Sequence, residues 1–362
     1  MKRLALFALL VVMLVSVIAP AALAQSGNPV QVAAETYFAG GTKNIKAADL
    51  FANLNDGDTS NDPFRVDIRA AADYANGHIP GAINIAGKDL FTAENLAKLP
   101  KDKQIVVNCY SGQTASQVTS ALRMMGYDAY NLLYAAPSWG TNEKVTYPFK
   151  AEQSGNYTYS KDPAQLEGSF EAPKPLGDTV EAAAQAYFAG GFKATKAADL
   201  FANLNDGDDS NNPVILDVRK PEDYAAGHIP GAVNVAVKDL FTTAVLAKLP
   251  ADKQIVAYCY SGQTASQATS ALRMLGYDAY NMQFGMPAWA IVDATSTPVW
   301  DVSKSLNQPL VLGSEPIAAA AQAADAAAAP APAALPTTGA PLFGLILAGL
   351  GLTGAGLALR KR

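Results

Sequence analysis

The octapeptide Cys-Tyr-Ser-Gly-Gln-Thr-Ala-Ser occurs twice in the chain, at residues 109–116 and at residues 259–266. Cys109 and Cys259, which open the two copies, are the only cysteines among 362 residues. An apolar run of strand length precedes each cysteine and apolar residues at helical spacing follow it, so the octapeptide is predicted to lead from a buried strand into a helix. A chain that keeps one cysteine at the same point of each copy, and no other, is expected to use the thiol for chemistry.

The duplication extends over most of the chain. A shift of 150 positions aligns Gly77-His-Ile-Pro-Gly-Ala82 with Gly227-His-Ile-Pro-Gly-Ala232, and Trp139 with Trp289. Solenoid and propeller repeats run at roughly 20 to 50 residues, so a period of this length describes a whole domain. Each copy is long enough to bury its own core, and two domains are therefore expected.

Helical and strand patterns alternate within each copy. This alternation favours an α/β fold of two tandem domains, each a parallel sheet flanked by helices. In the first copy we predict helices over residues 32–38, 47–54 and 114–125, and strands over residues 64–68, 82–85, 104–108 and 128–133. The corresponding strands of the second copy are predicted over residues 214–218, 232–235, 254–258 and 278–282.

The predicted turn after each cysteine favours a negative charge on the sulfur. Gly112 permits a tight backbone path, and a loop of this kind turns several amide N–H groups inward. The start of the following helix adds roughly half a positive charge. An ordinary thiol pKa of about 8.5 falls to about 3.5 to 7.5 in such surroundings, so we expect Cys109 and Cys259 to be largely thiolate near neutral pH. The structural alternative is a disulfide between these two cysteines, which requires the loops to face each other across a pseudo-twofold interface.

The N-terminal end has the pattern of a secretory signal peptide. Lys2 and Arg3 precede an apolar run, and the small-residue site Ala22-Leu-Ala24 follows it, which predicts cleavage before Gln25. A retained membrane anchor is the alternative.

The C-terminal end carries Leu335-Pro-Thr-Thr-Gly339, an apolar stretch over residues 340–359 long enough to span a bilayer, and a basic terminus. This order resembles the cell-wall sorting signal of monoderm bacteria. The resemblance implies that a sortase cuts between Thr338 and Gly339 and couples the chain to the envelope. An unprocessed transmembrane anchor is the alternative, and in either case the domains lie outside the membrane.

The charge of the chain argues against a nucleic-acid partner. The formal net charge is −5, and the two removable ends hold five basic residues and no acidic one, so the mature chain is more negative still.

Composition also separates the domains from an intervening Gly-, Ser- and Pro-rich linker and a later spacer. The predicted boundaries are 1–24 for the signal peptide, 29–149 for the first domain, 150–178 for the linker, 179–304 for the second domain, 305–334 for the Ala- and Pro-rich spacer and 335–362 for the sorting signal.

An ordered set of short motifs in the second copy points to a family. These are Asp217-Val-Arg219, Glu222-Asp-Tyr224, Gly227-His-Ile-Pro-Gly-Ala232, the strand-borne Cys259 and the run from Gly285 to Trp289. Together they resemble the rhodanese sulfurtransferases, and the resemblance covers nearly all of both copies. Two-domain rhodaneses commonly retain the cysteine only in the second copy. This chain departs from them by keeping both, so two active sites are predicted.

The resemblance implies a double displacement without a cofactor. A small sulfane-sulfur donor gives its terminal sulfur to Cys109 or Cys259, forming a persulfide, and cyanide, a thiol or a protein cysteine removes it. Related phosphatases and arsenate reductases use a seven-residue loop ending in Arg, whereas the sixth and seventh positions here are Thr and Ala, which argues against phosphatase chemistry.

The loop positions expected to bind the donor or the persulfide are Tyr110, Ser111, Gly112, Gln113 and Thr114 in the first copy, and Tyr260, Ser261, Gly262, Gln263 and Thr264 in the second. Thiosulfate-preferring members often carry a basic residue where this chain has tyrosine, so the donor stays open. The two glutamines either hydrogen-bond a donor at the mouth or are exposed polar residues. The hydroxyl groups of the serines and threonines are expected to donate hydrogen bonds to the persulfide. For the two threonines, capping of the following helix is the alternative.

Other polar residues are expected to be structural. Asp67 and Asp217 are predicted to bond loop amides, and Arg69 and Arg219 to pair with Asp73 and Asp223. His78 and His228 are expected to order a turn, Trp139 and Trp289 to close the core, and Arg123 and Arg273 to be surface charges. No pair of ligands supports a metal site. The sequence thus predicts a cell-surface sulfurtransferase, with a noncatalytic envelope scaffold and a persulfide or disulfide relay to a partner protein as alternatives.

Overall fold

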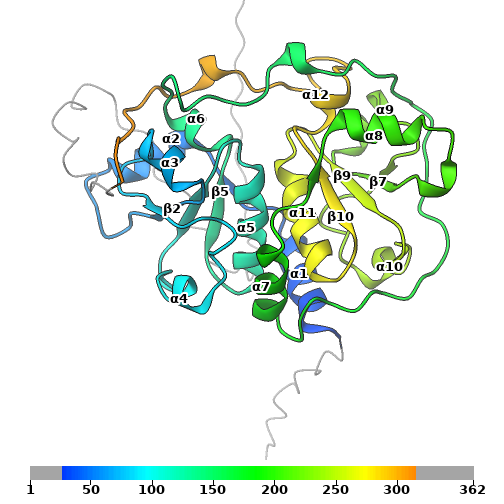
Figure 1. The fold of residues 1–362 in the computed structure, drawn as a ribbon, viewed down its shortest axis with the longest axis horizontal. Coiled ribbons are helices and arrows are strands. Elements are labelled where there is room, and N and C mark those ends of the chain that lie inside the picture. The colour runs from blue at the N-terminus through cyan, green and yellow to red at the C-terminus, as the bar shows by residue number, and fades with distance from the viewer. Residues whose placement is uncertain (1–26, 315–362) are drawn as a thin grey trace, which may run out of the picture.

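The computed structural model describes residues 27–314, which form two similar α/β halves side by side (Figure 1). Each half holds a five-stranded sheet in which all strand pairs are parallel, with the orders β1-β5-β4-β2-β3 and β6-β10-β9-β7-β8. Helices cover both faces of each sheet, because both faces carry apolar side chains. The predicted fold class of two tandem α/β domains is confirmed.

The first domain contains α1 (Pro29–Ala39), β1 (Asn44–Ile45), α2 (Ala47–Leu54), β2 (Phe64–Asp67), α3 (Ala71–Ala75), β3 (Ile83–Asn84), α4 (Ala93–Leu96), β4 (Ile105–Asn108), α5 (Gln113–Met124), β5 (Ala129–Leu132) and α6 (Ala135–Trp139). The second contains α7 (Val180–Ala189), β6 (Ala194–Thr195), α8 (Ala197–Leu204), β7 (Val214–Asp217), α9 (Pro221–Ala226), β8 (Val233–Asn234), α10 (Thr243–Leu246), β9 (Ile255–Tyr258), α11 (Gln263–Met274), β10 (Ala279–Met282) and α12 (Met286–Trp289). The 3₁₀ turns η1 (Ala151–Gln153), η2 (Asp209–Asn211) and η3 (Val302–Lys304) complete the described chain.

The two domains meet through α5 and α11, the helices that follow the cysteine loops, and these helices lie in the middle of the molecule (Figure 1). Ser120 and Ser270 are equivalent positions of the two helices, and their hydroxyl oxygens are 2.5 Å apart at the crossing. Beside them the Tyr187 hydroxyl donates to Gln117 of the other domain, and Gln267 accepts the mirror-image bond. The interface is therefore pseudo-twofold, and one apolar cluster runs through both domains.

Each domain is also covered by the segment that follows the other one. The linker runs over the second domain, where the Trp289 indole donates to the Thr158 carbonyl (2.9 Å). The segment after the second domain returns to the first, where the Trp139 indole donates to the Pro309 carbonyl (3.1 Å). Val311 then pairs with His78 in an antiparallel bridge. Residues 305–313, the beginning of the predicted spacer, therefore pack onto the first domain.

The predicted signal peptide, the sorting site at Thr338 and Gly339 and the apolar stretch over residues 340–359 lie outside the described residues. Within residues 27–314, no helix has both the length and the hydropathy that crossing a membrane requires.

Candidate active site

Each cysteine follows the carboxyl end of a central strand and lies under a loop of inward-facing amides. The Cys109 sulfur accepts the N–H groups of Gly112 (3.2 Å) and Ala115 (3.4 Å), and the Cys259 sulfur accepts that of Ala265 (3.5 Å). Gly112 has φ 87°, in the left-handed region where a side chain is strained, so the glycine is what permits this path. The predicted cradle of amides is confirmed in both domains.

The cradle does not make Cys259 a resting thiolate. Both cysteine side chains are only 1% exposed, and neither is in a disulfide. Burial raises the pKa of the Cys259 thiol above its ordinary value, and the loop amides, Ala265 first among them, lower it by less. The prediction that Cys259 is largely ionised near neutral pH is therefore wrong. The loop closes so tightly that the removal of water outweighs the hydrogen bonds it supplies.

The tyrosine at the second loop position ties the loop to the start of a neighbouring helix. The Tyr110 hydroxyl donates to the Asp73 carboxylate (2.6 Å) and accepts from the Ala70 amide (3.3 Å). Tyr260 makes the same pair of bonds, to Asp223 among others, in the second domain. Tyr110 is nevertheless 43% exposed, so its ring borders the surface above the loop.

The glutamines of the loops reach into the opposite domain. The Gln113 side-chain oxygen accepts from the Asn281 side chain (2.9 Å) and the Phe284 amide (3.1 Å). Gln263 makes the equivalent bonds in the first domain, including one from the Tyr134 amide (3.2 Å). Both glutamines are buried, and their side-chain oxygens are bonded to the opposite domain. Both alternatives that the sequence suggested, an exposed polar residue and a donor-binding group at the mouth of the site, are therefore wrong. Sequence reasoning within one repeat had no signal for a contact made between repeats.

Arg69 and Arg219 follow strands β2 and β7, and each folds back onto the carboxylate two residues before it. The Arg69 guanidinium contacts Asp67 at 2.6 Å and donates to the Gly77 carbonyl at 2.7 Å, and Arg219 does the same with Asp217. All four charged side chains are at most 3% exposed. The predicted pairing of the arginines with Asp73 and Asp223 is wrong, because tyrosine hydroxyls occupy those carboxylates. The expected bond from a loop amide to Asp67 is present, donated by Arg69 itself.

The smaller polar residues of the loops bond within the loop. Ser111 accepts from the Gln113 side chain (3.2 Å), and the second domain repeats this bond between Ser261 and Gln263 (3.1 Å). Thr114 does not cap α5, because Gly112 is the N-cap residue and no side chain forms a capping hydrogen bond to that helix. Thr264 likewise does not cap α11, whose N-cap residue is Gly262.

Three further expectations concern residues outside the loops. His228 is buried, stacks on the Tyr224 ring and bonds its carbonyl at 2.8 Å, and His78 is placed alike, which confirms a structural role. Trp139 and Trp289 are core residues as predicted. Arg123 is not a free surface charge: it pairs with Asp128 at 2.7 Å and is only 17% exposed, and Arg273 is equivalent.

One difference between the two sites lies immediately before the cysteines. In the second domain the Tyr258 hydroxyl donates to Asp217 (2.6 Å) and accepts from the Ile229 amide (3.2 Å). The first domain has Asn108 at this position, 1% exposed, and neither of its side-chain polar atoms has a partner among residues 27–314. The carboxylate network is therefore completed by a phenol in one domain only.

Between the two sites lies an aromatic cluster that sequence analysis missed. It consists of Tyr134, Tyr147, Phe149, Phe284 and Trp300, whose ring centroids are 4.7–6.2 Å apart in the contacting pairs. Tyr134 and Phe284, equivalent residues that follow β5 and β10, have φ of 61° and 62°. Left-handed backbone costs a residue with a side chain about 1 kcal/mol, so packing of these rings must offset the strain.

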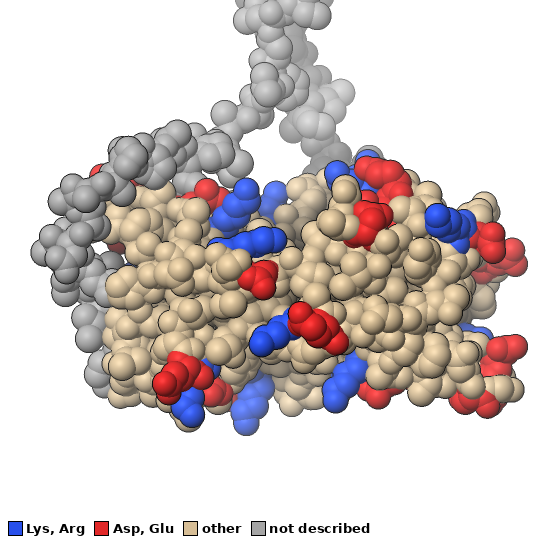
Figure 2. Space-filling view, turned by 90° about the horizontal axis from the view of Figure 1, so that it is seen from above, with Lys and Arg blue, Asp and Glu red and all other residues tan. Residues whose placement is uncertain are grey.

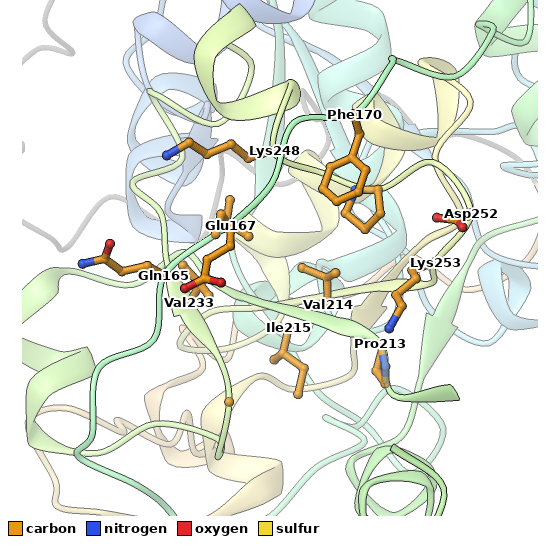
Figure 3. Close-up of a pocket in the computed structure, with 13 residues that line it drawn as sticks. Gln165, Glu167, Phe170, Pro213, Val214, Ile215, Val233, Lys248, Asp252 and Lys253 are labelled. Atoms are coloured by element: carbon orange, nitrogen blue, oxygen red, sulfur yellow. The ribbon is translucent and has the colours of Figure 1, made fainter. Parts of the chain in front are cut away.

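A separate surface pocket of about 410 Å³ lies at the other end of the second sheet (Figure 3). Pro213 and Val214 line it at the amino end of β7, whereas Cys259 follows the carboxyl end of β9. The linker contributes Glu167 and Phe170. This pocket is therefore not the cysteine site. On the side seen in Figure 2, acidic and basic side chains are interspersed, without a patch of one sign.

Comparison with known proteins agrees with this arrangement. The family model for the Rhodanese-like domain matches residues 46–141 and 197–291, which include both cysteine loops.

Curated relatives include a thiosulfate sulfurtransferase, GlpE, of Pseudoalteromonas translucida, which is 35% identical over 82 residues, or 22% of this chain and 76% of the relative. A tRNA sulfurtransferase of Pyrobaculum aerophilum is 43% identical over 70 residues, which are 19% of this chain and 14% of that protein. A probable adenylyltransferase/sulfurtransferase, MoeZ, of Mycobacterium tuberculosis is 26% identical over 58% of this chain and 52% of its own length. The chain therefore spans about half of MoeZ and a smaller part of the Pyrobaculum protein.

Among solved structures, a thiosulfate sulfurtransferase from Pseudomonas aeruginosa is similar to this chain at 19% identity and a TM-score of 0.27. The match covers 76% of this chain and 49% of that one.

Proposed function

Since the chain belongs to the family of proteins with rhodanese-like domains, we propose that it is a sulfurtransferase that carries sulfane sulfur on Cys109 and Cys259. The observation that carries the proposal is the set of backbone N–H groups aimed at each sulfur. Such a cradle stabilises a thiolate or a persulfide anion, whereas a purely structural cysteine needs no donors around it.

The reaction has two displacements. With thiosulfate as donor, the thiolate attacks the outer sulfur, a new sulfur–sulfur bond forms at the cysteine, the bond within thiosulfate breaks, and sulfite leaves with the electron pair. Cyanide then attacks the terminal sulfur of the persulfide, thiocyanate forms, and the cysteine thiolate is regenerated. Since burial raises the pKa of Cys259, its thiol must first lose a proton to solvent or to a base that enters with the donor.

The catalytic test removes each sulfur in turn. Cys109→Ala and Cys259→Ala variants should each retain part of the thiocyanate production from thiosulfate and cyanide, and the double variant should retain none. Mass spectrometry of the wild type after incubation with donor should show adducts of one additional sulfur atom. Undiminished turnover in the double variant would refute cysteine catalysis, and a wild type inactive with several sulfane donors would favour a scaffold.

We also propose that the protein acts outside the cytoplasmic membrane, attached to the envelope through its C-terminal signal. The support is the order of Leu335-Pro-Thr-Thr-Gly339, the apolar stretch and the basic end in the sequence. Replacing Thr338 and Gly339 should leave the protein in the membrane fraction instead of the cell-wall fraction. An unchanged distribution would show that no sortase uses this site.

A further inference from the structure

Tyr147 has no counterpart in the other repeat. The residue 150 positions later is Thr297, so the tyrosine belongs to the first half alone. Its ring nevertheless contacts both halves: it packs edge-on against Tyr134 of the first domain (6.0 Å) and Phe284 of the second (6.2 Å). Trp300 packs on it as well, at 4.7 Å between centroids. The ring is therefore held at the junction of the two domains.

The hydroxyl of Tyr147 is available to a ligand. The side chain is only 8% exposed, yet its hydroxyl bonds to no residue within 27–314, and it is not among the completely enclosed polar atoms. The hydroxyl therefore borders solvent, and a phenol set in an apolar wall offers its O–H to a polar group there. It marks a place in the aromatic cluster where a polar ligand can bind.

The neighbours of Tyr147 lead directly to both cysteine loops. The Tyr134 amide nitrogen lies 3.2 Å from where a β-carbon would stand on Gly112, and the Phe284 amide nitrogen lies 3.0 Å from that position on Gly262. Burial raises the pKa of Tyr147 above its ordinary value, and the charges of Tyr134, Cys109 and Cys259 add to the rise. The phenol therefore stays protonated, and the ring between the two loops carries a hydrogen-bond donor.

We propose that Tyr147 is a hydrogen-bond donor shared by the two cysteine sites, where it holds the anionic sulfur of a bound sulfane donor or of the persulfide. This inference rests on the proposed sulfur transfer and adds to it a residue that lies outside the loops. Because one hydroxyl donates to one anion at a time, it can bind the anion of only one of the two sites at any moment.

Tyr134 supplies a matched control. It is a second phenol of the aromatic cluster, but its ring contacts those of Tyr147 and Trp300 and does not reach Phe284 of the second domain. Its equivalent, Phe284, has no hydroxyl. Removing the Tyr134 hydroxyl should thus affect at most one of the two sites, whereas removing that of Tyr147 should affect both.

The experiment measures each site separately, in full-length protein carrying either Cys109→Ser or Cys259→Ser. In both backgrounds Tyr147→Phe should lower kcat/KM for thiosulfate about tenfold to hundredfold, the range for a lost hydrogen bond to a charged group. Tyr134→Phe should lower it in at most one of the two backgrounds. Because phenylalanine keeps the ring, the melting temperature should change little, whereas Tyr147→Leu should lower it.

The outcomes distinguish this inference from the proposed function. If Tyr147→Phe changes kcat/KM less than twofold at either site, the shared donor is refuted. The shared donor is also refuted if, in every variant, the decrease in kcat/KM parallels a decrease in the melting temperature. If the wild type itself forms neither thiocyanate nor a sulfur adduct, the proposed function fails. In that case calorimetry can measure the affinity of sulfite for the wild type and for Tyr147→Phe, which tests the hydroxyl alone. Equal affinities overturn the inference.

Discussion

The reciprocal glutamines should determine how firmly the two halves hold together, and Gln113→Ala tests this directly. The substitution removes the acceptor of two donors in the second domain, the Asn281 side chain and the Phe284 amide. Each buried donor left without a partner costs about 1–3 kcal/mol. Asn281 is completely buried and should bear the full cost, whereas Phe284 is only partly buried and should bear less of it. We therefore expect a loss of about 2–4 kcal/mol in the free energy of unfolding.

The assay is urea unfolding of residues 27–314, followed by tryptophan fluorescence and far-ultraviolet circular dichroism. A double-mutant cycle with Asn281→Ala separates the cross-domain bond from the bond of Gln113 to Ser111, and its coupling energy should be about 1 kcal/mol. Gln263→Ala, the equivalent change, should cost a similar amount because its bonds are the same. A loss below about 0.5 kcal/mol for Gln113→Ala, or no coupling with Asn281, would contradict the role of these bonds.

The other expected outcomes concern the cysteine sites. In the variant that keeps Cys259 as its only cysteine, the rate of sulfur loading should still rise at pH values above the ordinary thiol pKa. The raised pKa of Cys259 keeps the thiol protonated at lower pH, and only the thiolate attacks the donor. A rate independent of pH would contradict this. Gly112→Ala should lower the melting temperature and the activity, since its β-carbon would stand 2.2 Å from the Gln263 oxygen at a left-handed φ; wild-type values for both would contradict this. Tyr258→Phe should lower the free energy of unfolding by about 1–3 kcal/mol, because the Asp217 carboxylate loses a buried donor, and an unchanged urea midpoint would disprove this.

Patterns local to one repeat were readable from the sequence, and patterns between repeats were not. The helix at residues 47–54 was predicted to the residue, and the central strands were predicted to within a residue or two at each end. The two-residue strand β1 and the short helices α3, α4 and α6 were missed, because segments of two to five residues complete too little of a period to be recognised.

The errors at the site have a common physical origin. The interdomain bonds of Gln113 depend on the packing of α5 on α11, which no motif within a repeat records. The ionisation of Cys259 was misjudged because the sequence shows the amides of the loop but not the exclusion of water. Arg69 was assigned the wrong carboxylate because Tyr110 takes Asp73, a contact between residues 37 positions apart.

The duplication explains how two cysteine sites come to depend on one junction. In an isologous dimer the same residue of both subunits has the same surroundings at the interface. The contact between the equivalent Ser120 and Ser270 hydroxyls has this symmetry. Joining the copies in one chain allows the halves to diverge, and they have done so at Tyr147, where the second repeat has Thr297. A single half expressed alone would lack the glutamine of its partner and would expose the face of α5 that α11 covers. The structural unit is therefore the pair of domains, because the glutamine of each cysteine loop bonds to residues of the opposite domain.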